Sequence, residues 1–201
     1  MPLSLNQVID QVDKKEEIGY VFDAPFHYVV FTRKDNTWNL DRINAYLALL
    51  DKIEASSGPG VMVSIGIGPK HFSSGFDLPY WMADYANMRA SITQFTRLMA
   101  RLLEFSMPTM CVFNGSAIAG GYIFGLCHDY RIMHESAGSI CLSELKLGLA
   151  LPFPYMKVCA AKLDQGVMTR LACAITVNPQ PEALKDRLID ATYANLDDLS
   201  A

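Results

Sequence analysis

The chain has 201 residues, of which 51% are apolar and 19% are charged, and its net charge is −4. This length fits one compact domain with a sizeable core better than two small domains. The mild acidity provides no basic patch of the kind that binds nucleic acid, so we expect no nucleic-acid partner.

The sequence indicates an intracellular protein. No apolar stretch reaches the roughly 18 to 20 residues that a membrane-spanning helix requires, and residues 1–13 lack the basic and apolar regions of a secretory signal. The cysteines form no CxxC pair and lie in apolar runs, so we expect buried free thiols in a reducing compartment. The five are Cys111, Cys127, Cys141, Cys159 and Cys173.

Strand and helix patterns alternate along the chain, which predicts an α/β fold. Residues 1–24 are polar and weakly patterned, and we interpret them as a lead-in to a single domain over 25–201. The expected strands are 26–32, 61–67, 110–113, 130–134 and 139–142. The expected helices are 41–55, one long helical stretch over 80–105, then 119–126, 155–163, 166–174 and 181–188.

The first candidate site segment is residues 71–78, with the sequence HFSSGFDL. Small residues and a glycine follow a strand, and Asp77 can cap the helix that comes next. A turn of this kind can leave a backbone N–H, here that of Phe76, pointing into a cleft. The alternative is an ordinary tight connection between a strand and a helix.

The second segment is residues 114–121, with the sequence NGSAIAGG, between an apolar strand and an apolar helix. Glycines permit close backbone approach, and a helix N-terminus presents free N–H groups to an anion. Gly120 N–H could therefore receive a ligand oxygen. The alternative is close helix packing through small residues. The segment lacks the Lys-Ser/Thr ending of a phosphate-binding loop, which argues against a nucleotide site.

The third segment is residues 142–149, with the sequence LSELKLGL. Glu144 stands among apolar residues at the end of a short strand, and burial would raise its pKa toward the range of a general base. The alternative is a surface carboxylate paired with Lys146. The histidines (His27, His71, His128 and His134) show no metal-ligand spacing, so we expect no metal site.

Taken in order, the three segments together with Asp129-Tyr130-Arg131 resemble the enoyl-CoA hydratase/isomerase (crotonase) superfamily. The resemblance implies a spiral of ββα units, here with shortened C-terminal helices. It also implies an oxyanion hole in which the N–H groups of Phe76 and Gly120 hold a thioester carbonyl. The substrate-binding residues that it implies are Ser74, Gly75, Asp77, Leu78, Gly121 and Ile123.

The resemblance is closest to the monofunctional Δ3,Δ2-enoyl-CoA isomerases of fatty-acid β-oxidation, including the plant peroxisomal type. Hydratases of the family use two glutamates; Glu144 matches the second, whereas Ile123 stands in place of the first. A single carboxylate suits a proton shuttle from C2 to C4 of a 3-enoyl-CoA. The alternatives are a hydratase or other crotonase-type chemistry, and a non-catalytic subunit of a larger assembly.

The resemblance also bears on cofactors, partners and compartment. The shuttle needs no cofactor, because coenzyme A is part of the acyl-CoA substrate. Members of the family assemble as trimers or as dimers of trimers, so we expect a homotrimer or a hexamer. We favour the peroxisome as the compartment, with the mitochondrion or the cytosol as alternatives.

Overall fold

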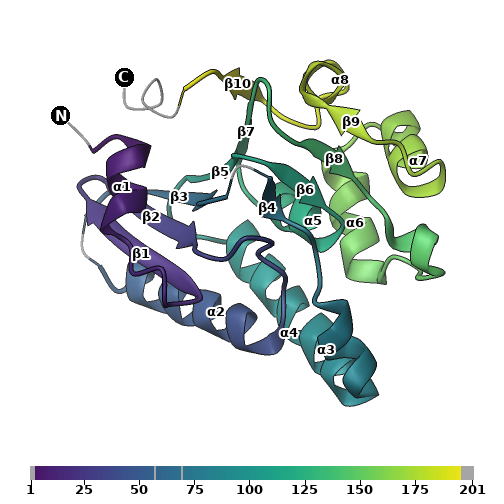
Figure 1. Ribbon diagram of the computed structural model, residues 1–201, viewed down its shortest axis with the longest axis horizontal. Coiled ribbons are helices and arrows are strands. Elements are labelled where there is room, and N and C mark those ends of the chain that lie inside the picture. Colours follow the sequence, from purple (N-terminus) through teal and green to yellow (C-terminus); the bar gives the residue numbers. More distant parts are fainter. Residues whose placement is uncertain (1–2, 57, 69, 196–201) are drawn as a thin grey trace.

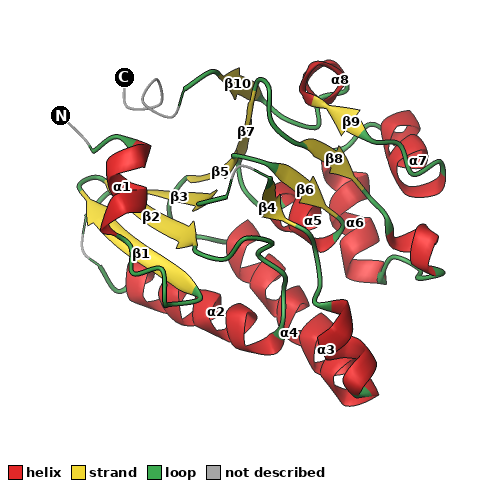
Figure 2. Cartoon of the chain, in the orientation of Figure 1, coloured by secondary structure: helices red, strands yellow, loops and turns green. Residues whose placement is uncertain are grey.

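The computed structural model describes residues 3–56, 58–68 and 70–195. Helices and strands alternate along the chain, as Figures 1 and 2 show. The helices are α1 (Leu5–Gln11), α2 (Leu40–Glu54), α3 (Leu78–Ala83), α4 (Tyr85–Leu103), α5 (Gly120–Leu126), α6 (Phe153–Lys162), α7 (Gln165–Cys173) and α8 (Gln180–Lys185), with the short 3-10 helix η1 (Glu144–Leu147) between β8 and α6. The strands are β1 (Ile18–Asp23), β2 (Phe26–Phe31), β3 (Val61–Gly66), β4 (His71–Ser73), β5 (Thr109–Phe113), β6 (Ser116–Ile118), β7 (Tyr130–His134), β8 (Ser139–Cys141), β9 (Asn178–Pro179) and β10 (Ala191–Tyr193).

The strands form two sheets. The larger one has the order β1-β2-β3-β5-β7-β10, in which β1 pairs antiparallel with β2 and every other pair is parallel. The smaller one has the order β4-β6-β8-β9, with β4, β6 and β8 parallel to one another. Parallel neighbours joined through helices confirm the predicted α/β class.

The larger sheet is buried on both faces. Side chains alternate along a strand, so Val29 and Phe31 of β2 point into one apolar cluster whereas Tyr28 and Val30 point into another. Helices α2 and α4 cover the first face, and α1 covers the second (Figure 1). The protein therefore has a layered core of the kind expected for strands that read as continuous apolar runs.

Most of the predicted elements are confirmed. The strand expected at 26–32 is β2 and the helix expected at 41–55 is α2, whose buried positions lie on one face. The strands expected at 61–67, 110–113, 130–134 and 139–142 are β3, β5, β7 and β8, and the four helices expected after residue 118 are α5 to α8. Within the described residues no helix is long and apolar enough to cross a membrane.

Four expectations need correction. The first 24 residues, expected to be a weakly patterned lead-in, contain α1 and β1, and β1 forms the edge of the larger sheet. The stretch 80–105 is two helices, because Asp84 is extended and its side chain caps α4 by accepting from Ala86 N–H. Glu144 begins η1 rather than ending a strand. The cysteine Cys173 is exposed, whereas the other four are buried as expected.

The smaller sheet determines where the three candidate segments meet. Each segment follows one of its parallel strands: residues 74–77 follow β4, residues 119–121 follow β6, and residues 142–147 follow β8. Because adjacent parallel strands end at the same edge of a sheet, the three connections lie side by side. Segments more than 60 residues apart in the sequence are thereby brought to one place.

Phe124 lies at the centre of an aromatic cluster in the core, and we expect its side chain to contribute strongly to the stability of the fold. Phe124 is fully buried, with its ring centroid 4.9 Å from that of Trp38 and 5.1 Å from that of Tyr46. We expect Phe124→Ala to lower the free energy of unfolding by about 3–5 kcal/mol, since the cavity would be lined by rigid rings. Urea unfolding followed by circular dichroism measures this loss. The control is Phe153→Ala, because Phe153 is exposed, and it should cost less than about 1 kcal/mol; equal losses in both variants would contradict this account of the core.

Candidate active site

A cavity of about 250 Å³ lies at the edge where β4, β6 and β8 end. Its walls are almost entirely apolar, and Glu144 is the one carboxylate among the described residues that line it. The lining residues come from the loop after β4 (Ser74, Phe76), from α3 and α4 (Leu78, Trp81, Met88, Ile92), from the residue before α5 (Ala119), and from residues 143–155 (Ser143, Glu144, Leu147, Leu149, Ala150, Pro152, Tyr155). An apolar pocket with few polar groups is typical of a small-molecule site.

Glu144 enters this cavity from the first position of η1. The helix is one turn long and ends at Gly148, whose φ of +68° lies in the left-handed region that favours glycine. Its carboxyl oxygen Oε2 is buried and has no hydrogen-bond partner in the described part of the chain. Burial therefore raises the pKa of the Glu144 carboxyl above its usual range.

The alternative role of Glu144, a surface carboxylate paired with Lys146, is wrong. Among the residues that the structure describes, Glu144 makes no ion pair, and Lys146 is exposed to solvent. A buried carboxylate without a partner is destabilising. An unpaired group of this kind at a cavity wall is characteristic of a functional site rather than of a structural ion pair.

The N–H of Phe76 is oriented by the carbonyl of the same peptide unit. Gly75 O accepts a hydrogen bond of 2.8 Å from Trp38 N–H, and Trp38 O in turn accepts one of 3.0 Å from Asp77 N–H. Because the C=O and N–H of a trans peptide unit point in opposite directions, the Phe76 N–H points away from Trp38. No acceptor for this N–H is present among residues 3–56, 58–68 and 70–195.

The same geometry orients the N–H of Gly120. Ala119 O accepts hydrogen bonds from Tyr122 N–H at 3.0 Å and from Ile123 N–H at 3.1 Å, so it points along α5. The Gly120 N–H consequently points out of the helix, and in the described structure it too has no acceptor. Ala119 itself has a φ of +50°, a conformation that costs free energy for a residue with a side chain and that clusters at functional sites.

Glycines bring the two N–H groups close together. Gly75 has a φ of +91°, and a Cβ placed on it would lie 3.1 Å from Ala119 Cβ and 3.4 Å from Gly120 N. A Cβ on Gly120 would in turn lie 3.0 Å from the Phe76 ring. Ala119 N–H also donates to Cys141 O at 2.8 Å, which ties the second segment to the third. Two unpaired N–H donors and one unpaired carboxylate therefore belong to adjacent loops around one apolar cavity.

The expected site residues fall into two groups. Ser74, Phe76, Leu78 and Glu144 line the cavity, and Gly120 follows the lining residue Ala119. The other expected residues do not line the cavity; they pack against neighbouring segments or cap a helix. Asp77 caps α3 by accepting from Tyr80 N–H, Gly75 and Gly121 allow close contact between loops, and Ile123 is fully buried in the core.

The apolar lining from distant elements was only partly predicted. Leu78 is an expected lining residue, and Trp81 of α3 also lines the cavity, with its ring centroid 4.3 Å from that of Phe76. Met88 and Ile92 of α4 were missed, as was Tyr155 of α6. A signal for the first two exists, because they continue the helical face of the buried Phe95 at spacings of seven and three residues.

One of the four histidines, His128, has a structural role in the core. His128 is fully buried between Ser64 Oγ at 2.9 Å and Phe124 O at 3.1 Å, and burial lowers its pKa to about 3. The described residues contain no group of three His, Cys, Asp or Glu side chains that could hold a metal ion.

The chain is similar in sequence to known proteins of one family. The family model for enoyl-CoA hydratase/isomerase matches residues 26–199. Enoyl-CoA delta isomerase 3 of Arabidopsis thaliana is 33% identical over 141 residues, which cover 68% of this chain and 59% of that protein. Peroxisomal enoyl-CoA delta isomerase 2 of the same plant is 30% identical over 142 residues, with the same coverage of both chains. The chain thus spans about three fifths of the length of these relatives.

The fold is shared with solved structures. The crystal structure of a probable enoyl-CoA hydratase from Mycobacterium tuberculosis aligns with a TM-score of 0.83 and 21% identity, covering 89% of this chain and 75% of that one. At this identity the likeness concerns the fold alone. The predicted crotonase-like fold and the predicted family are confirmed.

The buried carboxylate predicts a pH-dependent stability difference. A carboxyl whose pKa is raised in the folded state makes the protein less stable as the pH rises from the unfolded pKa of that carboxyl, about 4.3, through its folded pKa. Glu144→Gln removes this cost, so we expect a higher Tm than for the parent at pH 7–8, by about 2–4 °C for each kcal/mol relieved. Thermal unfolding from pH 4 to pH 8 measures the difference, which should shrink toward pH 4.

The matched control for this series is Glu182→Gln, since Glu182 lies on the exposed face of α8. Its Tm should follow that of the parent across the whole range. A Glu144→Gln variant that is less stable than the parent at pH 8, or that differs from it equally at every pH, would contradict the unpaired, buried state of this carboxyl.

Proposed function

The chain belongs to the enoyl-CoA hydratase/isomerase family, and we propose that it converts a 3-enoyl-CoA into the trans-2-enoyl-CoA. The observation that carries this proposal is the half-buried carboxylate of Glu144, which makes no ion pair among the described residues and whose buried Oε2 has no hydrogen-bond partner, in an apolar cavity that it shares with Phe76. The proposed context is fatty-acid β-oxidation, since both Arabidopsis relatives bear the name enoyl-CoA delta isomerase.

The proposed reaction begins with the thioester carbonyl oxygen accepting hydrogen bonds from Phe76 N–H and Gly120 N–H. Glu144 removes a proton from C2, and the electron pair of the broken C–H bond delocalises over the thioester and the C3–C4 double bond as a dienolate. The oxygen carries much of the new charge, where two aimed donors stabilise it; one such donor typically contributes about 3 kcal/mol.

The second half of the reaction returns the proton. Protonated Glu144 donates it to C4, where the C3–C4 π pair forms the new C–H bond. The C1–C2 pair of the dienolate moves to C2–C3, and the carbonyl re-forms. The raised pKa of the Glu144 carboxyl favours the first step, because it makes the carboxylate a stronger base toward C2, and the apolar cavity limits exchange of the abstracted proton with water before it reaches C4. No other reactant is consumed, so the proposed reaction needs no cofactor beyond the coenzyme A of the substrate.

Isomerisation is preferred to hydration because of Ile123. This residue stands where hydratases of the family have their first glutamate, and here it is apolar and fully buried. An isoleucine at this position provides no group to hold or activate the attacking water. The apolar lining of the cavity supports the same choice, since a dry site protects a dienolate from side reactions.

Assembly and compartment form part of the proposal. We propose a homotrimer or hexamer, as for other members of the family. A peroxisomal location is supported by two Arabidopsis relatives whose names include that compartment, while a mitochondrial isomerase from rat is 28% identical to this chain.

The test is an isomerase assay on the purified chain with a 3-enoyl-CoA, followed by the absorbance of the conjugated product. We expect Glu144→Gln to lower kcat by at least about 1000-fold, because an amide neither accepts nor returns the proton. The control variant Glu182→Gln, which alters an exposed carboxylate of α8, should retain parental activity.

Two results would contradict the proposal. Full activity in Glu144→Gln would exclude this residue as the base. Addition of water to crotonyl-CoA at a rate comparable with isomerisation would instead identify the protein as a hydratase.

A further inference from the structure

Residues 35–38 are bound along their whole length to the loop that carries Phe76. Six hydrogen bonds join the two segments, and they involve backbone and side-chain groups on both sides. They are Ser74 N–H to Asp35 O, Ser74 Oγ to Asp35 O, Asn36 Nδ2 to Phe72 O, Ser73 Oγ to Asn36 O, Trp38 N–H to Gly75 O, and Asp77 N–H to Trp38 O. The position of residues 35–38 consequently determines the position of residues 72–77.

Trp38 is the part of this segment that acts on the candidate site. Its N–H and its carbonyl bind the peptide units on either side of Phe76, at 2.8 Å and 3.0 Å. The bond to Gly75 O fixes the peptide plane that contains the Phe76 N–H. Any shift of the Trp38 backbone would therefore rotate this N–H.

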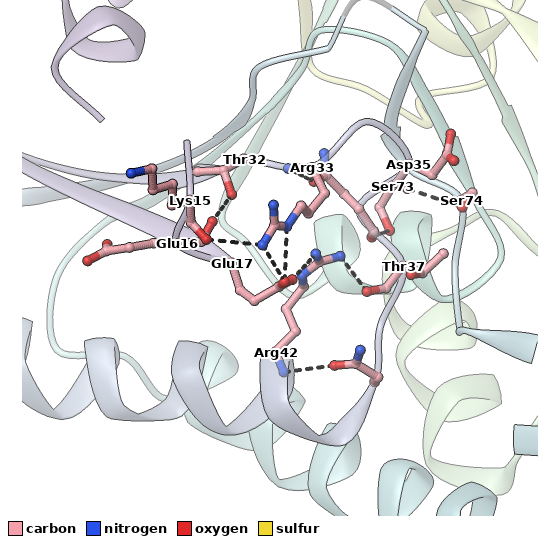
Figure 3. A network of polar contacts seen from close by, with 12 residues as sticks. Lys15, Glu16, Glu17, Thr32, Arg33, Asp35, Thr37, Arg42, Ser73 and Ser74 are labelled. Atoms are coloured by element: carbon pink, nitrogen blue, oxygen red, sulfur yellow. Dashed lines mark hydrogen bonds and ion pairs between the residues drawn. The ribbon is translucent and has the colours of Figure 1, made fainter. Parts of the chain in front are cut away.

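A buried arginine holds the backbone just before Trp38. Arg42, in the first turn of α2, has a side chain that is 3% exposed, and its guanidinium donates to Thr37 O at one end and to the Glu17 carboxylate at the other. Figure 3 shows this guanidinium between Glu17 and Thr37. Its backbone is fixed as well, because Asn39 caps α2 by accepting from Arg42 N–H at 2.9 Å.

Glu17 provides the charge that a buried guanidinium requires. Burial alone would raise the pKa of the Glu17 carboxyl, but the hydrogen bonds and charges of Arg33 and Arg42 outweigh it and lower the pKa. Glu17 therefore stays ionised at neutral pH. Arg33 binds the outer oxygen of Glu17 at 2.8 Å and also Lys15 O at 3.1 Å, which anchors Glu17 to the turn before β1 (Figure 3).

From these contacts we infer that Arg42, held by Glu17, is a positioning residue that keeps the Phe76 N–H aimed at the substrate carbonyl by fixing the Thr37–Trp38 backbone. The inference rests on the proposed function, since it assigns the Phe76 N–H to the oxyanion hole. Arginine suits this role because its planar fork binds two acceptors in fixed directions, which a lysine does not.

The inference is tested with acetoacetyl-CoA, a 3-oxoacyl thioester that loses a C2 proton to give an enolate with its own near-ultraviolet absorbance. Donors aimed at the enolate oxygen shift the bound ligand toward this form. We expect the parent chain to increase the enolate share over that in water, and Arg42→Met to reduce the enolisation constant of the bound ligand by about tenfold or more. A pH titration of the absorbance with the protein in excess gives this constant directly.

Kinetics with a 3-enoyl-CoA provide the second readout. A donor that acts mainly on the developing oxyanion affects kcat more than KM. We expect Arg42→Met to lower kcat by about 10- to 100-fold with KM within about twofold of the parent. The kcat of Arg42→Lys should lie between those of the parent and of Arg42→Met, and Glu17→Gln should show a smaller loss of kcat with KM little changed. These two variants keep the test valid if Arg42→Met does not fold.

The matched control is Arg101→Met. Arg101, in the last turn of α4, also bridges two acceptors with its guanidinium, Asp51 Oδ1 at 2.8 Å and Glu54 Oε2 at 2.6 Å. Both acceptors lie near the C-terminal end of α2, whereas Arg42 lies in its first turn. The loss of Arg101 should lower Tm without changing the enolisation constant or kcat. The inference would be overturned if the Arg42→Lys and Glu17→Gln variants fold and have the enolisation constant and the kcat of the parent. A parent chain that binds acetoacetyl-CoA without increasing its enolate share would instead contradict the proposed function.

Discussion

The C=O and N–H groups of one peptide unit point in opposite directions, and the candidate site is built on this constraint. At Gly75 the carbonyl is bound by Trp38, so the Phe76 N–H faces the other way. At Ala119 the carbonyl is bound inside α5, so the Gly120 N–H faces out of the helix. The donors need no side chain of their own. Their direction is fixed by hydrogen bonds formed on the far side of each loop, and their closeness depends on glycine at position 75.

The apolar cavity changes the chemistry of the one acid that enters it. Glu144 loses hydration and gains no ion pair in the described structure, which raises its pKa and makes its charged form costly. The same low polarity strengthens the interaction of backbone donors with a developing negative charge. The Glu144 carboxylate therefore lowers the free energy of unfolding, and the strained backbone of Ala119 lowers it further. The surrounding aromatic core, centred on Phe124 and Trp38, offsets both.

The sequence predicts those parts of the fold that have long periodic patterns. The apolar face of α2 and the aromatic run of β2 are read directly from spacing, and Asp77 is correctly expected to cap a helix. Strands of three residues, such as β4 and β6, are too short to show a period, yet their parallel pairing is what brings the site together. The helical pattern of 80–105 hides the break at Asp84, where one extended residue separates α3, which has no buried residue, from α4, which buries one face.

The site itself was predictable mainly in the segments that follow its strands. Glu144, Phe76 and Gly120 lie in recognisable segments, whereas the lining residue Tyr155 comes from a helix whose packing the sequence does not specify. The pairing of Glu17 with Arg42 joins residues 25 positions apart with no shared motif, so spacing gives no sign of it. The salt bridge between Glu17, in the turn before β1, and Arg42, in α2, can be predicted only once β1 is known to form the edge of the larger sheet.

The central claim is that two backbone N–H groups and Glu144 converge on one thioester. The measurement that tests it most directly is the structure of the Glu144→Gln variant with a 3-enoyl-CoA bound. The account predicts a thioester oxygen about 2.7–3.1 Å from both Phe76 N and Gly120 N, with C2 and C4 both facing the side chain at position 144. A thioester bound elsewhere, or a carbonyl that accepts from neither N–H, would contradict it.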